Sequence, residues 1–206
     1  MNVKKILHVI FGSFIMGVGI SLTISVNLGS DPMTMFWIGI AKTLGITVGQ
    51  ANLLVSAVML VYVLKVDRRQ IHLGSFLNPI VISLTTDALQ FLDLQYFTYP
   101  FRILILITGL LMLAFGIAYY ALADYGKGAY EAVVFTTVNK TNWSIGVVRT
   151  GADIIFAVLG VLLGAVFSIG SLLAILFMGT SIQMCIRFLE SNIDSTSLVK
   201  RNYKNN

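Results

Sequence analysis

The polar side chains best suited to chemistry in this chain lie inside long apolar stretches. Arg149 and Asp153 are four residues apart, so they share one face of a helix. An offset of 97 residues relates them to Asn52 and Ser56, which share a face in the same way. Ionisable groups at membrane depth are costly and are functional candidates by default. The two polar faces therefore predict a cavity that binds a solute.

Three further polar residues join this candidate site. Gln50 precedes Asn52 on the same predicted helix, and Asp87 lies in the apolar stretch that follows. Glu131 falls in the first turn of a short predicted helix, where the helix dipole favours an acid. We expect these residues to line the cavity together with Arg149 and Asp153.

Each of these residues has a functional and a structural interpretation. In the functional one, Arg149 binds an anionic group of the solute, and Asp153, Asp87 or Glu131 is a carboxylate linked to a proton or cation. In the structural one, Arg149 and Asp153 form a buried ion pair that fixes helix packing. Asp87 then bonds a neighbouring helix, and Glu131 caps its own.

The composition places the chain in a membrane. Of its 206 residues, 57% are hydrophobic and 11% are charged, and the mean hydropathy is +0.87. Soluble domains carry about 25% charged residues. The net charge of +5 comes mostly from lysines and arginines at the ends of apolar runs, a membrane pattern that does not indicate nucleic-acid binding. We therefore expect an integral membrane protein whose partners are the lipid bilayer and an unknown small solute.

Two interruptions divide the apolar runs. At the first, Gly29, Asp31 and Pro32 come together, and proline cannot continue the preceding helix but suits the start of a new one. The second has Gly126 and Gly128. Each break precedes a run too short to cross a bilayer, which needs roughly 20 apolar residues. Broken segments at matching positions of two halves are a sequence signal of a transporter site.

The chain repeats one layout of three long helices and one short helix. The predicted helices cover 6–26, 32–44, 48–64 and 73–92 in the first half, and 101–122, a run to 140, 144–166 and 171–189 in the second. Several glycines also match at the offset of 97. The predicted fold is all-α: a first repeat at 1–98, a second at 99–189 and a polar tail at 190–206. Each repeat has three transmembrane helices and one short re-entrant or interfacial helix.

Three crossings in each half make the two repeats inverted. With Lys4 and Lys5 inside, the clusters at 65–69, 127–140 and 187–204 all fall on the cytoplasmic side. Only Lys42 and Arg102 do not fit this pattern. We therefore expect six crossings, with both termini in the cytoplasm.

No set of residues predicts catalysis, a cofactor or a metal site. His8 and His72 are isolated, and Cys185 has no acid or histidine near it in the sequence. A phosphate-binding loop of the G-x-x-x-x-G-K-[ST] kind does not occur. We expect a protein that is not an enzyme.

The motifs around the first break resemble the YczE/YyaS/YitT family of bacterial integral membrane proteins. The similarity is carried by 17–22, 27–32 and 46–49, and extends through Gly74–Ser75 and 148–153. The resemblance implies a multi-pass protein of the bacterial plasma membrane, often taken to be a transporter, and it implies no substrate.

Two functions from different classes follow. The first is a small permease or exporter that moves a solute by alternating access between the inverted halves. The second is a non-transporting scaffold or regulator that acts through partner helices, supported by glycine-rich packing faces. A homodimer is compatible with either function.

Overall fold

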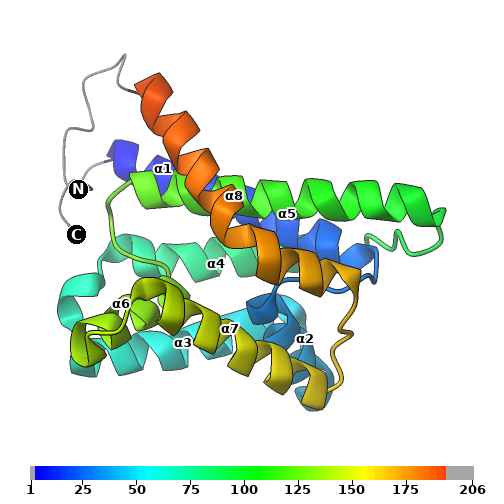
Figure 1. Cartoon of the computed structure of the whole chain (residues 1–206), viewed down its shortest axis with the longest axis horizontal. Helices are drawn as coiled ribbons and strands as arrows, with labels where there is room; N and C mark the ends of the chain where they lie inside the picture. The colour runs from blue at the N-terminus through cyan, green and yellow to red at the C-terminus, as the bar shows by residue number, and fades with distance from the viewer. Residues whose placement is uncertain (1–2, 194–206) are drawn as a thin grey trace.

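The computed structural model describes residues 3–193, and these are helical with no strand (Figure 1). The elements are α1 (Val3–Ser25), α2 (Pro32–Leu44), α3 (Val48–Val66), the 3₁₀ turn η1 (Arg68–Gln70), α4 (Leu73–Ala88), α5 (Tyr99–Leu122), α6 (Ala129–Thr141), α7 (Ile145–Leu162) and α8 (Ile169–Ile193). The predicted all-α class and the predicted order of long and short helices are confirmed.

Some helix ends differ from the prediction. Helix α4 ends at Ala88 rather than at residue 92, because the chain beyond it forms turns in which the Gln90 N–H donates to the Asp87 carbonyl and the Leu92 N–H to the Leu89 carbonyl. Helix α8 continues to Ile193, so the predicted tail begins inside a helix. The rest of that tail, from residue 194, lies outside the described residues.

Within residues 3–193, five helices are long and apolar enough to cross a membrane: α1, α3, α5, α7 and α8. Helix α4 is not among them, since it has 16 residues. The prediction of six crossings thus exceeds this set by one. The 13 residues each of α2 and α6 are too few to span the roughly 30 Å hydrocarbon core.

The first break starts α2 as the sequence predicts. Asp31 is the N-cap, and its carboxylate accepts a 3.1 Å hydrogen bond from the Thr34 N–H. Pro32 occupies the first turn, where it lacks only an N–H that the helix leaves unpaired. Gly45 ends the helix at a φ of +66°, a left-handed conformation that favours glycine.

Helices α1 and α5 cross at two glycine pairs. Gly12 lies against Gly116, and Gly19 lies against Gly109. A Cβ atom at Gly19 would come within 2.6 Å of the Gly109 carbonyl oxygen, so these positions need glycine for the backbones to approach. The two glycine pairs occur in opposite order along α1 and α5, so these helices are antiparallel.

Among the remaining helices, the two short ones pack mainly on the opposite half. Helix α4 packs against α1, and α8 packs against α5. The short helix α2 packs mainly on α7 of the second half, whereas α6 packs mainly on α3 of the first. Figure 1 shows α2 and α6 at opposite ends of the molecule.

At one end of the molecule, which we call the first end, backbone hydrogen bonds join the two halves. The Gly74 N–H donates to the Tyr125 carbonyl at 3.0 Å, and the Lys127 N–H donates to the Gln70 carbonyl at 3.1 Å. The Asn139 side chain donates to Asp67 at 3.2 Å. The start of α4, the second break and the end of α6 therefore lie together.

At the opposite end, which we call the second end, hydrogen bonds again hold separate segments together. The Gly170 N–H donates to the Leu28 carbonyl at 2.8 Å, and the Leu94 N–H donates to the Ser25 carbonyl at 3.0 Å. The Lys42 ammonium donates to the Gly164 carbonyl at 2.8 Å. The first break, the end of α2 and the start of α8 therefore lie together.

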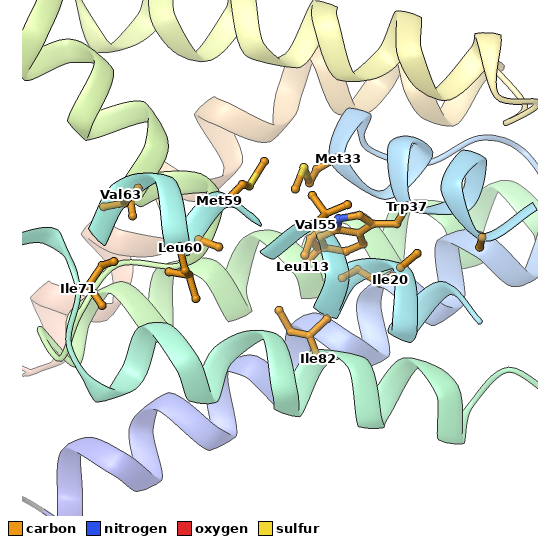
Figure 2. Close-up of a cluster of buried hydrophobic side chains, with 14 residues drawn as sticks. Ile20, Met33, Trp37, Val55, Met59, Leu60, Val63, Ile71, Ile82 and Leu113 are labelled. Carbon is orange, nitrogen blue, oxygen red and sulfur yellow. The ribbon is translucent and has the colours of Figure 1, made fainter. Parts of the chain in front are cut away.

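The largest buried apolar cluster follows α3 and reaches α1, α2, α4 and α5 (Figure 2). It includes Ile20, Met33, Trp37, Ile82 and Leu113. The outer faces of the long helices expose large apolar side chains, among them Ile155 on α7 and Leu176 on α8. Large exposed apolar surfaces mark membrane or protein contacts.

Candidate functional site

A central cavity of about 80 Å³ lies where the buried core meets the starts of α2 and α6. Ile20, Met33, Trp37, Ile82 and Leu113 supply apolar wall from the core shown in Figure 2. The polar wall consists of Asp31, Thr34, Asn52, Ser56, Asn78, Tyr130, Glu131, Arg149 and Asp153. The structure thus brings four predicted binding residues, Asn52, Glu131, Arg149 and Asp153, into one cavity.

Tyr130 connects Asp153 and Arg149. Its hydroxyl donates to the Asp153 carboxylate at 2.5 Å and lies 3.4 Å from the Arg149 carbonyl. The guanidinium carbon of Arg149 lies 5.4 Å from the centre of the Tyr130 ring, a cation–π distance. The only ion pair within residues 3–193 is Lys5–Asp124, at 4.0 Å. Arg149 and Asp153 therefore do not form an ion pair within 4.0 Å, and the hydrogen bond to the Asp153 carboxylate comes from Tyr130.

Asn52 belongs to a buried network between α3 and α4. Its amide donates to Ser83 at 2.9 Å and to the Pro79 carbonyl at 3.3 Å, and its oxygen accepts from Ser56 at 3.0 Å. Asn52 is only 2% exposed. The network fixes α3 against α4 and places Asn52 and Ser56 at the cavity wall with these hydrogen bonds already made.

Glu131 lies where the central cavity meets a second cavity. The second cavity measures about 190 Å³ and lies at the first end, lined in part by Arg69, Asp124 and Lys127. Glu131 and Asn78 line both cavities. A solute or an ion that passes between the two spaces would therefore pass this carboxylate.

Two predicted site residues lie elsewhere. Gln50 is exposed, and its side chain accepts from the Thr47 N–H at 3.1 Å as part of the capping box of α3. Asp87 accepts from the Thr47 hydroxyl at 2.6 Å and from the Gly49 N–H at 2.9 Å. Neither lines the central cavity. They hold the start of α3, so the structural interpretation of Asp87, a bond to a neighbouring helix, is the one the geometry favours.

The predicted hinge residues are in close contact with the opposite half. Gly29 has a φ of +84° and Gly126 a φ of +104°, both in the region that glycine prefers. A Cβ at Gly29 would lie 2.5 Å from the Ser171 hydroxyl, and one at Gly126 would lie 2.6 Å from the Ser75 hydroxyl. Asp31 and Pro32 line the central cavity, whereas Gly128 lines the second.

Four side chains with polar groups in the central cavity were not predicted from the sequence: Thr34, Trp37, Asn78 and Tyr130. The sequence does carry one signal for two of them. The offset of 97 relates Thr34 to Glu131, and Tyr130 directly precedes Glu131. Trp37 has no comparable signal, because a tryptophan in a short apolar helix is typical of a core.

A protein family described as "Family of unknown function (DUF6198)" matches residues 3–187. The chain belongs to this family. The matched range contains every residue that lines the central cavity. No solved structure matches the chain.

Relatives from two bacteria are similar over most of the chain. An "Uncharacterized protein" of Haemophilus influenzae is 30% identical over 187 residues, which cover 90% of this chain and 85% of the relative. The "Uncharacterized membrane protein YczE" of Bacillus subtilis is 28% identical over 82% of this chain and 79% of its own length. The "Uncharacterized protein YyaS" of the same organism is 22% identical over 90% and 94%. The resemblance to YczE and YyaS is thus confirmed, and a multi-pass membrane protein fits both the relative's name and the five candidate spans.

Proposed function

We propose that this DUF6198 protein is a small-solute permease whose two inverted repeats share the central cavity. It is not an enzyme in this proposal; it binds a solute at Arg149, Asp153 and Glu131 and exposes it alternately to the two sides of the bacterial plasma membrane. The polar wall of the cavity is the main support for the proposal, because ionisable groups at membrane depth are costly and are usually functional.

The composition of the cavity wall supports the repeat. Each lining residue except Asp31 and Trp37 has a counterpart on the same wall, at an offset of 97 or, beyond residue 74, of 96. Asn52 corresponds in this way to Arg149, and Thr34 to Glu131. A cavity on the axis that relates two repeats has this property, and substrate sites of inverted-repeat transporters lie at the repeat interface.

Paired contacts between the halves support the same arrangement. The bond from Gly74 to Tyr125 at the first end corresponds to the bond from Gly170 to Leu28 at the second. The offset of 97 relates Gly12 to Gly109 and Gly19 to Gly116, so each glycine pair at the crossing of α1 and α5 corresponds to the other. A two-fold relation between antiparallel halves produces such exchanged pairs.

Arg102 and Lys42, the two basic residues that did not fit the charge pattern, also make contacts between the halves. Arg102 donates to the Val26 carbonyl at 2.6 Å, and its counterpart Lys5 donates to the Asp124 carbonyl at 2.9 Å. Lys42 donates to the carbonyl at Gly164. A cation at the C-terminal end of a helix is favoured by the helix dipole, so Arg102 and Lys42 have local reasons to lie at the second end.

In this proposal α4 supplies the sixth crossing. Helix α4 starts near the first end at Gly74, and the chain reaches the second end at Leu94. Lys5 and the clusters at 65–69 and 127–140 lie at the first end, so we assign that end, and both termini, to the cytoplasm. The second cavity then gives the central cavity a path toward the cytoplasmic side.

A transport assay with the full chain tests the proposal. Proteoliposomes are incubated with a mixture of amino acids, amines and carboxylic acids, and the solutes inside are measured by mass spectrometry. We expect at least one solute to accumulate with the native protein and none with Arg149→Ala or Asp153→Asn. Asp93→Asn, in an exposed loop, is the matched control and should transport normally.

Two results would contradict the proposal. Normal transport by both cavity variants would remove the site. No transport of any solute by a folded native protein would favour the alternative, a non-transporting scaffold or regulator. In either case the oligomeric state, for which a homodimer is one option, is measured separately by light scattering in detergent.

A further inference from the structure

Two charged groups of the central cavity, one of each sign, make no hydrogen bond or ion pair with another residue in the described range 3–193. The Arg149 guanidinium lies over the Tyr130 ring and interacts electrostatically with Asp153, and the Glu131 carboxylate interacts electrostatically with Lys127. By contrast, Asp31 accepts from the Thr34 N–H, and Asp153 accepts from the Tyr130 hydroxyl. Arg149 and Glu131 are thus the charged groups of the wall whose side chains make no hydrogen bond within residues 3–193, whereas Asp31 and Asp153 are held by other residues.

Two neutral polar atoms of the same wall are also unpartnered. The Thr34 hydroxyl is fully buried and Trp37 is 7% exposed, yet neither Thr34 Oγ1 nor Trp37 Nε1 has a hydrogen-bond partner among residues 3–193. Both residues line the central cavity. A buried polar group without a partner costs about 1 to 3 kcal/mol, so a ligand group that hydrogen-bonded to either atom would relieve that cost.

The size and chemistry of the cavity restrict that molecule. A volume of about 80 Å³ corresponds to roughly three water molecules at about 30 Å³ each, so the central cavity holds only a very small solute, and a longer one would extend past Glu131 into the second cavity. No group of three His, Cys, Asp or Glu side chains within the described residues is placed to hold a metal ion. Much of the wall is apolar, which suits a small organic molecule with polar ends.

We infer that the central cavity binds a small zwitterion, with its anionic group at Arg149 and its cationic group at Glu131. The planar guanidinium of arginine pairs well with a carboxylate. The Glu131 carboxylate complements an ammonium group, and Thr34, its counterpart in the first half, offers a hydroxyl on the same wall. This inference rests on the proposed function, since it names the class of the transported solute.

The test compares ligands that differ by one charged group. Glycine, β-alanine and glycine betaine are the zwitterions, methylammonium carries only the cation and acetate only the anion. The thermal unfolding midpoint of the purified full chain in detergent is measured as each probe is titrated at constant ionic strength. We expect at least one zwitterion to raise the midpoint saturably, because a ligand that binds only the folded state stabilises it. Methylammonium and acetate should each give much weaker binding.

Variants separate binding at the cavity from a general solute effect. Arg149→Gln and Glu131→Gln should each weaken zwitterion binding about tenfold or more, since each removes one charge-assisted contact. Arg149→Lys keeps the charge and should weaken it less. Asp93→Asn and Lys140→Gln, at exposed positions, should bind as the native protein does. The unliganded midpoint of each variant, measured in the same run, shows whether it is folded.

Three results would overturn the inference: no saturable response to any zwitterion, equal responses to a zwitterion and to methylammonium or acetate, or native affinity in both glutamine variants. The transport assay keeps this inference distinct from the proposed function. Saturable binding of a zwitterion without its transport would contradict the permease and leave the binding site. Transport of another solute class with all zwitterions inert would contradict the zwitterion site and leave the permease.

Discussion

The hydroxyl of Tyr130 donates a 2.5 Å hydrogen bond to the carboxylate of Asp153 and so joins α6 to α7 at the cavity wall. The corresponding residues of the first half are Met33 and Ser56, which cannot form this bond. Two halves with one layout therefore differ in chemistry, and the second half supplies Glu131, Arg149 and Asp153.

Removal of that hydroxyl should destabilise the protein. In Tyr130→Phe the Asp153 carboxylate loses its hydrogen bond while partly buried, and we expect the free energy of unfolding to fall by about 1 to 3 kcal/mol. Tyr119→Phe is the control, because the Tyr119 ring stacks on His8 and its hydroxyl has no partner within residues 3–193. Unfolding in detergent, followed by circular dichroism, measures both variants. Equal stability of the two variants would contradict this role of Tyr130.

Asp87 should matter for stability and not for solute binding. Asp87→Asn replaces a carboxylate that accepts from Thr47 and Gly49 at the start of α3, and we expect a loss of about 1 to 3 kcal/mol in the free energy of unfolding. Transport per folded molecule should remain native, in contrast to Asp153→Asn. If Asp87→Asn were as stable as the native protein but did not transport, Asp87 would belong to the binding site.

The crossing of α1 and α5 should not tolerate a side chain. A Cβ at Gly19 would lie 2.6 Å from the Gly109 carbonyl oxygen, so Gly19→Ala must force the two backbones apart, at a cost of about 1 to 3 kcal/mol. The control is Gly179→Ala in α8, where a Cβ would meet nothing within 4 Å. That variant should keep or raise the unfolding midpoint, since alanine favours helix. A lower midpoint for Gly179→Ala than for Gly19→Ala would refute the close crossing.

The link between α6 and the end of α3 should weaken in acid. Hydrogen bonds from the amides of Gln70 and Asn139 hold the pKa of Asp67 below its ordinary value. A carboxyl whose pKa is lower in the folded than in the unfolded state stabilises the protein above the unfolded pKa, and this contribution is lost as the pH falls through the folded pKa.

The Asp67→Asn variant isolates this effect, because an asparagine side chain does not gain or lose the proton. We expect native protein to unfold at a higher temperature than Asp67→Asn near pH 6, and the difference to shrink as the pH falls below about 4. Paired unfolding scans across this pH range give the difference directly. A difference that stays constant with pH would show that the Asp67 carboxylate is not linked to folding.

Much of the backbone was predictable from local chemistry. Pro32 after Gly29 and Asp31 can only end one helix and start another, and the repeated glycines locate the same event in the second half. The positions of α2 and α6 follow from these residues. The end of α4 was not predictable in this way, because Leu89, Phe91 and Leu92 continue the apolar run past the last helical turn.

The site was predictable only in part. The spacing of Arg149 and Asp153 gives their shared face, but it does not show that Tyr130 from another helix lies at that face. Gln50 and Asp87 look alike from sequence as polar groups among apolar ones. Both serve the start of α3. The capping box of Thr47 and Gln50 is local and follows from their spacing, whereas the role of Asp87 depends on the approach of α4 and cannot be seen in the sequence.

The central claim is that two inverted halves share one cavity, and side-specific labelling tests it most directly. Single cysteines are introduced into a Cys185→Ser protein at Arg69 and Trp143 near the first end, and at Tyr96 and Phe167 near the second, and intact cells are treated with a membrane-impermeant maleimide. We predict that Tyr96→Cys and Phe167→Cys are labelled in intact cells, and that Arg69→Cys and Trp143→Cys are labelled only after the membrane is opened. Labelling of Arg69→Cys and Tyr96→Cys from the same side would contradict the inverted arrangement.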